Sequence, residues 1–475
     1  MPRPPNAATL EELKAAVGGS WLGSPDAVAP FLSDFRRLYH GATPLVLSPR
    51  NVDEVANVLR ICHRDEVAVV PHGGNTSYCG AATPDASGSQ IVLSMRRLNR
   101  VRQLDAADYS MTVEAGCTLA EAQAAARGAD RLFPLSLGSE GTAQIGGNLS
   151  TNAGGTGVLR YGMMRDLVLG LEVVLADGRV LAGLKNLRKD NTGYDVKSLF
   201  VGAEGTLGVI TAASLKLFPQ PADTATALVG IDSPRHGLEL LSRLRTAAGD
   251  QVTAFELMPR IAVELTVKHV PGVADPQGLR TPWYLLIELS SPNPRQDLLT
   301  LLTATLEDAA ERATIKDAML ATSMAQAQAM WKLRESVPEA QRRHGASLKH
   351  DVSVPVSAIP RLIEDGAALV RRLAPEGDVV SYGHAGDGNL HFNVSQKPGA
   401  DVARFLAQGP ALELAMFDLV ETLGGSISAE HGIGRLRAAE FARRADPVEL
   451  SVMRELKRAL DPKGIMNPGK VLCTR

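Results

Sequence analysis

Three side chains in two short segments are of the types that bind a divalent metal. His384 and His391 lie within residues 381–394, and Glu430 follows in a second glycine-rich segment. In the first segment, turn-forming residues stand between two strand-like runs, so the spacing predicts a hairpin with the two histidines roughly opposite each other. Two imidazoles and one carboxylate leave a coordination position open, which is the ligand set of a catalytic Zn²⁺ or a similar ion.

His431 follows Glu430 directly, and we interpret it as the general base of the same site. An imidazole in that position can lie beside a metal without binding it and can take a proton from the substrate. A single histidine in an apolar run is more often a core residue than a ligand. Four candidates in two short segments of low charge favour the functional interpretation.

The composition describes an ordinary globular protein with no bias toward nucleic acid or anionic membranes. The 475 residues are 45% hydrophobic and 21% charged, which predicts two or three domains with a large core. The 50 basic and 52 acidic residues nearly cancel, and only 4% of the residues are aromatic. The chain shows no secretory signal, no stretch long enough to span a bilayer, and four cysteines without metal or redox spacing. We therefore expect a cytoplasmic protein with reduced thiols.

Three glycine-rich loops before residue 212 indicate one extended polar ligand. Residues 71–77 follow a β-branched strand, and glycines there let backbone N–H groups approach an anion closely. Residues 134–155 carry six glycines and five serines or threonines with almost no charge, and residues 201–211 form the third loop. Neither the Rossmann glycine fingerprint nor a P-loop occurs, so a nucleotide would be bound in another way.

The pattern of strands and helices predicts an α+β protein that divides near Pro219-Gln-Pro221. Residues 8–40 are expected to be helical, with Thr9 and Glu12 as a capping box. In the second half, strands alternate with long helices, which favours an antiparallel sheet with helices on one face. The expected strands there are 226–231, 283–289, 379–382 and 392–394, and the expected helices are 239–248, 321–341 and 359–373.

Eight motifs in order resemble those of one enzyme family, over about residues 44–472. They read PHGGNTSYCG, IGGNLSTNAGG, LGLEVVLADG, LRKDNTGYDVKSLF, GAEGTLGVIT, GHAGDGNLHFNV, SAEHGIG and LDPKGIMNPGKVL. The chain is similar to the FAD-dependent D-2-hydroxyacid dehydrogenases of the vanillyl-alcohol-oxidase/PCMH flavoprotein superfamily, and most similar to the D-2-hydroxyglutarate dehydrogenases among them. The resemblance implies a PCMH-type FAD-binding domain of two α+β subdomains (1–221), an α+β substrate-binding cap domain with an antiparallel sheet and the metal hairpin (222–425), and a C-terminal segment that returns to the FAD domain (426–475).

The resemblance also implies which residues hold the cofactors. Relatives with covalently bound flavin carry a histidine at the position of Thr76, so the FAD is expected to be non-covalent. The divalent metal, expected to be Zn²⁺, would be bound by the residues already proposed as ligands. The predicted FAD-binding residues are Gly73, Gly74, Asn75, Thr76, Ser77, Gly138, Ser139, Thr142, Ile145, Gly146, Gly147, Asn148, Thr151, Asn152, Gly154, Gly205, Gly208, Ile210 and Asn467.

The implied reaction is oxidation of a D-2-hydroxyacid to the 2-oxoacid, with D-2-hydroxyglutarate and 2-oxoglutarate as the expected pair. The metal would lower the pKa of the substrate hydroxyl, His431 would bind the substrate and take the proton, and C2 would deliver hydride to flavin N5. Arg334, Lys349 and Asn393 would bind the substrate as well. Relatives that use hydroxyglutarate carry a threonine where this chain has Pro338, which leaves the choice of hydroxyacid open.

Several alternatives remain at this level. D-malate has the same two charges on a shorter chain, and D-lactate lacks the distal carboxylate that Arg334 and Lys349 would pair with. From other classes, a flavin-free metal-dependent hydrolase and a flavin-binding module without catalysis stay open. The expected electron acceptor is external, such as electron-transfer flavoprotein or a quinone-linked carrier. The metal's identity and the oligomeric state, including a homodimer, are undecided.

Overall fold

The structure is a computed structural model, and it describes residues 2–276 and 280–473. It divides into two compact units. The first unit comprises Met1–Gly154, Gly162–Gln220 and Glu430–Arg475, and the second comprises Gly155–Tyr161 and Pro221–Ala429. The expected boundaries were residues 221 and 425, so the second unit also takes residues 426–429 and the short segment before residue 162.

The first unit contains two main sheets. One has the order β1-β2-β4-β3, in which β2 and β3 each run parallel to β4, and the other is an antiparallel sheet with the order β5-β6-β10-β8-β9. The antiparallel pair β8–β9 forms a hairpin, which the alternating Leu and Val residues before Ala176-Asp177-Gly178 predict for residues 167–181. The strands are β1 (Trp21–Leu22), β2 (Val46–Leu47), β3 (Val69–His72), β4 (Ile91–Ser94), β5 (Val101–Asp105), β6 (Ser110–Glu114), β8 (Val168–Val174), β9 (Val180–Gly183) and β10 (Val209–Lys216), and the small pair β7 (Arg131–Leu132) and β11 (Phe218–Pro219).

Helices of the first unit cover these sheets, and its last segment adds to the edge of the first sheet. Met466 forms a parallel bridge with Val69 of β3. The N–H of the next residue, Asn467, donates to the Val69 carbonyl at 2.8 Å. The C-terminal segment is therefore part of the same unit as β3. The helices are α1 (Ala7–Ala16), α2 (Pro25–Val28), α3 (Val52–Asp65), α4 (Leu119–Gly128), α5 (Ile145–Ser150), α7 (Met164–Leu167), α16 (Ala438–Arg444) and α17 (Pro447–Leu460).

The prediction that residues 8–40 are helical is wrong for most of the range after Ala16, where only α2 and a short 3-10 helix (Ala29–Phe31) follow. The helix α1 ends at Ala16 because Gly18 and Gly19 adopt positive φ angles, which a helix cannot continue through. The capping box is wrong too, since Asn6 is the N-cap and its side chain accepts the Thr9 N–H at 2.9 Å.

The second unit is an antiparallel sheet with helices on both faces. Its strand order is β15-β12-β14-β13-β18-β19-β16, and β17 also pairs with β19. Alternate residues of β12 and β14 face two separate cores, so the prediction of helices on one face is wrong. The strands are β12 (Asp223–Ile231), β13 (Val252–Pro259), β14 (Trp283–Ser291), β15 (Asp317–Leu320), β16 (Ser347–Leu348), β17 (Asp351–Ser353), β18 (Gly377–His384) and β19 (Asn389–Gln396).

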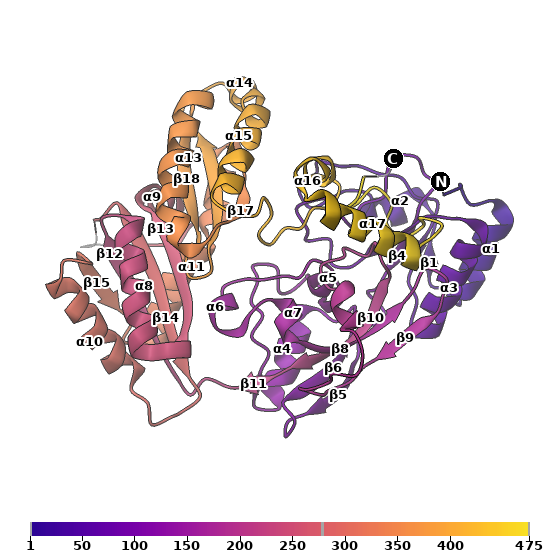
Figure 1. The fold of residues 1–475 in the computed structure, drawn as a ribbon, viewed down its shortest axis with the longest axis horizontal. Helices are drawn as coiled ribbons and strands as arrows, with labels where there is room; N and C mark the ends of the chain where they lie inside the picture. The colour runs from indigo at the N-terminus through magenta and orange to yellow at the C-terminus, as the bar shows by residue number, and fades with distance from the viewer. Residues whose placement is uncertain (1, 277–279, 474–475) are drawn as a thin grey trace. The chain divides into compact units, whose positions relative to one another are not determined.

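One core is formed with α8 (Pro234–Ala248), α10 (Leu298–Glu311), α13 (Ile359–Leu373) and α15 (Gly409–Thr422), and α8 lies in front of the sheet in Figure 1. The other core is formed with α9 (Arg260–His269), α11 (Met324–Glu335) and α12 (Val337–His344). The remaining helices are α6 (Val158–Tyr161) and α14 (Val402–Ala407). The sequence predicted one helix over residues 321–341, but the chain breaks at Ser336 because Pro338 belongs in the first turn of a new helix. Among the described helices, none is both long and apolar enough to cross a membrane.

Candidate metal and flavin sites

The hairpin β18–β19 carries both predicted histidine ligands on one face. His384 pairs with Asn389, and His391 pairs with Tyr382, so the two histidines are diagonal neighbours two residues apart in register. Their ring centroids are 5.6 Å apart. The sequence predicted the two histidines roughly opposite each other; the register makes them diagonal rather than directly paired, because the reversal over residues 385–388 begins immediately after His384. The diagonal still places both imidazoles within reach of one ion.

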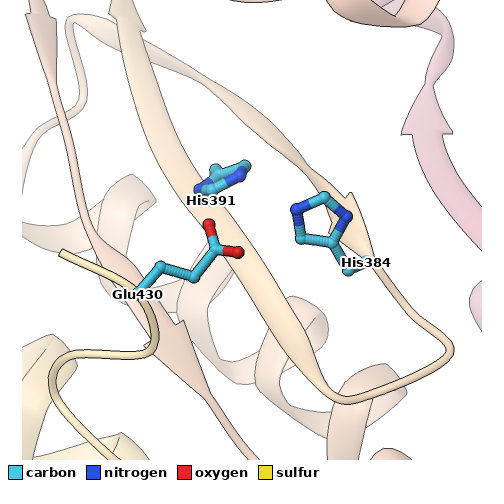
Figure 2. A group of neighbouring side chains, drawn as sticks. All are labelled: His384, His391 and Glu430. Atoms are coloured by element: carbon cyan, nitrogen blue, oxygen red, sulfur yellow. The ribbon is translucent and has the colours of Figure 1, made fainter. Parts of the chain in front are cut away.

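Glu430 joins the two histidines from the segment that follows the second unit. A bridge between Ser353 and Ser426 and a hydrogen bond from the Ala429 N–H to the Asp351 carbonyl (3.4 Å) hold the preceding residues against β17. The three side chains offer ligand atoms that all lie within 4.8 Å of one another, and Figure 2 shows them facing one another. Two imidazoles and a carboxylate fit a divalent ion with an open position, so the donor set is chemically suited to the expected metal.

Glu256 of β13 lies directly across from His384 in the sheet. Its Oε1 is 2.6 Å from Nδ1 of His384, and its Oε2 is 2.7 Å from Nε and 2.6 Å from Nη2 of Arg334. Burial by itself would raise the pKa of Glu256, but the charges of His384 and Arg334 outweigh burial and lower the pKa to about 2. The carboxylate is therefore ionised and bonded on both oxygens.

A second buried carboxylate lies beside the other histidine. Asp351 of β17 pairs with His391 in register, and its Oδ1 is 3.6 Å from the His391 Nδ1, which is longer than a hydrogen bond. The same oxygen accepts a hydrogen bond from Asn389 Nδ2 at 3.0 Å. In the order β13-β18-β19-β17, the four strands thus present carboxylate, imidazole, imidazole and carboxylate side by side.

Arg334 has a protein partner that the sequence did not reveal. It is 6% exposed on α11, its Nε and Nη2 are taken by Glu256, and its guanidinium lies 4.9 Å from the Tyr382 ring centroid. The described residues offer Nη1 no acceptor. The expected role of Arg334 in substrate binding stays a prediction, with Nη1 as the nitrogen that would contact the substrate.

The other predicted substrate ligands lie on the same face of this sheet. Asn393 is two residues beyond His391 on β19, is buried, and donates from Nδ2 to Gln341 Oε1 at 2.9 Å. Gln341 in turn donates to Ser395 Oγ at 3.0 Å. Leu348 pairs with Val394, and the His350 carbonyl accepts the Phe392 N–H. Lys349 lies between these two positions. The register therefore puts Lys349 beside Asn393.

His431, the predicted base, stacks on Tyr78 of the first unit, with ring centroids 4.5 Å apart and an interplanar angle of 26°. The loop that follows is anchored by Glu204, which accepts the Ile433 N–H at 2.7 Å and the Gly434 N–H at 2.8 Å. Burial raises the pKa of Glu204 to about 7, against the lowering effect of these donors. The backbone that follows His431 is thus held in place, and the role of His431 as base stays a prediction.

All predicted flavin-binding residues lie in the first unit, where several form a close-packed cradle. A Cβ on Gly74 would lie 2.0 Å from the Thr142 carbonyl oxygen, so the loop after β3 contacts the segment that leads into α5. Asn467 Nδ2 donates to the carbonyls of Ala81 (3.0 Å) and Glu204 (2.7 Å), which joins the third loop and the C-terminal segment to the residues that follow the first loop.

The cradle retains polar atoms that suit a polar ligand. Among the described residues, Gln144 Oε1, Asn148 Nδ2 and Asn467 Oδ1 are buried without a hydrogen-bond partner. A Cβ on Gly138 or on Gly147 would meet no atom within 4 Å. Backbone that is open on one side beside unsatisfied polar groups fits a dinucleotide held by N–H groups and amides.

Three of the predicted cofactor residues have packing roles that the structure makes plain. A Cβ on Gly146 would lie 2.7 Å from the Ala115 Cβ, and one on Gly208 would lie 2.9 Å from Val173 Cγ1. Ile210 is buried and pairs with Val173 between β10 and β8. These positions explain why helix and strands can approach closely, and their contact with FAD stays a prediction.

The sequence patterns did not point to five residues of this site: Glu256, Asp351, Glu204, Tyr78 and Gln341. Glu256 carried a usable signal, because it is the one charged residue in the apolar run of β13, and isolated charges are rarely buried unless paired. Glu204 and Tyr78 stood within glycine-rich motifs that were assigned to the cofactor as a whole. Gln341 gave no signal, since its partners come from a strand more than fifty residues away.

Comparisons with known proteins agree on one family. A model described as FAD binding domain matches residues 43–183, and one described as FAD linked oxidases, C-terminal domain, matches residues 220–471. The mitochondrial D-2-hydroxyglutarate dehydrogenase of Bos taurus is 39% identical over 466 residues, covering 98% of this chain and 83% of that protein. The D-2-hydroxyglutarate–pyruvate transhydrogenase of Saccharomyces cerevisiae is 36% identical over 460 residues, covering 94% and 90%. The crystal structure of p-cresol methylhydroxylase with substrate bound shares the fold, with a TM-score of 0.77, 16% identity, and coverage of 100% and 99%.

Proposed function

The chain belongs to the FAD-dependent D-2-hydroxyacid dehydrogenases, and from that premise we propose that it oxidises D-2-hydroxyglutarate to 2-oxoglutarate with the help of a divalent metal. The observation that carries the proposal is the convergence of His384, His391 and Glu430 within 4.8 Å in a chain with an FAD-binding domain. A flavin-free hydrolase does not account for that domain.

Each group at the site has one task in this reaction. FAD, when bound, supplies the acceptor for the hydride that leaves C2 of the substrate. A divalent ion, when bound, supplies Lewis acidity that lowers the pKa of the 2-hydroxyl. His384, His391 and Glu430 would hold that ion, and His431 would accept the hydroxyl proton on an imidazole nitrogen. The stack on Tyr78 and the Glu204 anchor restrict how far the His431 ring can move, which favours a constant geometry for proton transfer.

The substrate's far carboxylate would be recognised by Nη1 of Arg334 and the ammonium of Lys349, with Asn393 as a neutral contact. A dicarboxylate suits two cations better than D-lactate does, because an unpaired buried cation is costly. The loss of a hydroxyl at Pro338 keeps D-malate as the second candidate, since it has the same two carboxylates. We also propose an external electron acceptor, a non-covalent FAD and a Zn²⁺ ion, and a cytoplasmic location stays a prediction.

The test is a steady-state assay with an artificial dye as acceptor. We expect the purified protein to contain FAD and to oxidise D-2-hydroxyglutarate with a higher kcat/KM than D-malate or D-lactate, and we expect a chelator to abolish turnover until Zn²⁺ is restored. His431→Ala should lower kcat by about 10²- to 10⁴-fold, the range for loss of a general base, while FAD and metal content stay unchanged. His236→Ala on α8 is the matched control. Full activity after complete metal removal, or a near-normal kcat for His431→Ala, would refute the assigned roles.

A further inference from the structure

Glu256 is the one charged residue of β13, and both of its carboxylate oxygens have partners. The strand β13 reads Val-Thr-Ala-Phe-Glu-Leu-Met-Pro, and Glu256 is 1% exposed. The sheet register puts it directly opposite His384, and the 2.6 Å contact runs from Oε1 to Nδ1 of that imidazole. The other oxygen of this carboxylate is paired with the guanidinium of Arg334, and a carboxylate in such a pair accepts hydrogen bonds on both oxygens, so Nδ1 carries the proton in this contact.

We propose that Glu256 is a positioning residue of the metal site: it holds His384 in the Nδ1–H tautomer and so presents Nε2 to the ion, an inference that rests on the metal-dependent function proposed above. A carboxylate that accepts the second ring N–H of a ligating histidine fixes the ring's orientation and raises its basicity as a ligand. The contact reaches across one pair of strands, so the ring orientation is set by sheet register rather than by a mobile loop.

The same carboxylate holds Arg334. Oε2 accepts a hydrogen bond from Nε and forms an ion pair with Nη2, so the guanidinium plane is fixed, and Nη1 is the nitrogen that remains for the substrate. Glu256 therefore joins the proposed metal ligand His384 to Arg334, the predicted substrate-binding residue, with one carboxylate oxygen on each. A displacement of Glu256 would disturb metal binding and substrate binding together.

A purely structural ion pair is the competing explanation. Buried ion pairs are often no more stabilising than apolar residues of the same volume, so stability by itself gives little reason for three polar partners inside this core. Glu288 on the neighbouring strand β14 offers the comparison within the same sheet. The Glu288 carboxylate accepts a hydrogen bond from Nε1 of Trp331 at 2.7 Å, and Trp331 lies on α11 like Arg334. In the part of the chain that the structure describes, Glu288 has no hydrogen bond to a proposed metal ligand. A structural role predicts similar effects at both positions, whereas a positioning role predicts a difference.

The experiment measures Zn²⁺ affinity of the FAD-loaded protein by competition with a chromophoric chelator. Glu256→Gln should weaken Zn²⁺ binding by about 10- to 100-fold, the range for loss of an outer hydrogen-bond partner of a metal ligand. Glu288→Gln should leave the Zn²⁺ affinity within a factor of about two. The FAD content, measured from the flavin absorbance, should be unchanged in both variants, because the predicted FAD cradle lies in the first unit. Wild-type Zn²⁺ affinity in folded Glu256→Gln would overturn the inference.

A measurement on the unaltered protein covers the case in which Glu256→Gln does not fold. The chain has ten histidines, so labelling with [¹⁵N]histidine gives a short list of ring signals in the Zn²⁺-loaded protein. We expect a ring proton on Nδ1 of His384 and metal bonding through Nε2, assigned by the signal that His384→Asn removes. Metal bonding through Nδ1 would overturn the inference. If the wild-type protein oxidises D-2-hydroxyglutarate with Zn²⁺ and Glu256→Gln binds Zn²⁺ normally, only this inference fails. If the wild-type protein neither binds Zn²⁺ nor oxidises D-2-hydroxyglutarate, the proposed function fails and this inference fails with it.

Discussion

Replacing Arg334 with methionine should destabilise the second unit far more than replacing an exposed arginine does. The guanidinium and the carboxylate of its partner Glu256 have side-chain exposures of 7% and 1%, so neither gains much from water. Removing one partner of a buried pair leaves an uncompensated charge and costs about 3–5 kcal/mol. Because His384 still donates to Oε1 of Glu256, we expect the lower end, about 3 kcal/mol in the free energy of unfolding.

Arg243→Met is the matched control, because Arg243 pairs with Asp308 in the same unit with side-chain exposures of 34% and 45%. Exposed pairs of this kind contribute about 0.2–1 kcal/mol. Two of the three tryptophans, Trp283 and Trp331, lie in the second unit, so urea unfolding in a Trp21→Phe background reports on that unit by fluorescence.

The double variant Arg334→Met/Glu256→Gln tests the cause. Without the buried negative charge, the loss of Arg334 should destabilise much less, so the double variant should lose less than the sum of the single variants. In the same samples, Arg334→Met should raise KM for D-2-hydroxyglutarate far more than for D-lactate. A loss no larger than that of Arg243→Met would refute the reasoning that Glu256 depends on this cation, and equal changes in KM would remove Arg334 from substrate recognition.

Two further predictions concern the first unit. Burial raises the pKa of Glu204 from 4.5 to about 7, so the folded state holds a proton that the unfolded state has lost, and stability should fall by about 3 kcal/mol as pH rises from 4.5 through 7. Glu204→Gln should remove this part of the pH dependence in urea titrations, and an unchanged slope would contradict the prediction. Asn467→Ala removes donors to the Ala81 and Glu204 carbonyls, and the protein should release FAD more readily, seen as a lower ratio of flavin to protein absorbance after gel filtration. Asn186→Ala, in the same unit but outside the predicted FAD-binding residues, should leave this ratio unchanged.

Local signals in the sequence were sufficient for most strands and for naming the three side chains that the structure brings together as candidate metal ligands. Hydrophobic runs bounded by turn residues located β8–β9, β12, β14 and the hairpin β18–β19, since the period of a strand is short and turn formers mark its ends. Histidine and glutamate are few and chemically distinct, so a cluster of ligand types was visible without any structure. The prediction of helical structure over residues 8–40 failed at Gly18 and Gly19, because it relied on apolar spacing and disregarded these two glycines.

Contacts between strands that are far apart in the sequence could only come from the tertiary structure. The pairing of Glu256 with His384 joins positions 128 residues apart, and that of Arg334 with Glu256 joins positions 78 residues apart. Its side-chain type made Arg334 a reasonable ligand for a substrate carboxylate. A buried charge, however, pairs with an opposite charge beside it, and strand register decides which residue supplies that charge. The sequence by itself determined which groups could bind a metal and a flavin. The fold decided which carboxylate orients which imidazole, because hydrogen-bond partners in a sheet depend on strand order and register, which no local pattern contains.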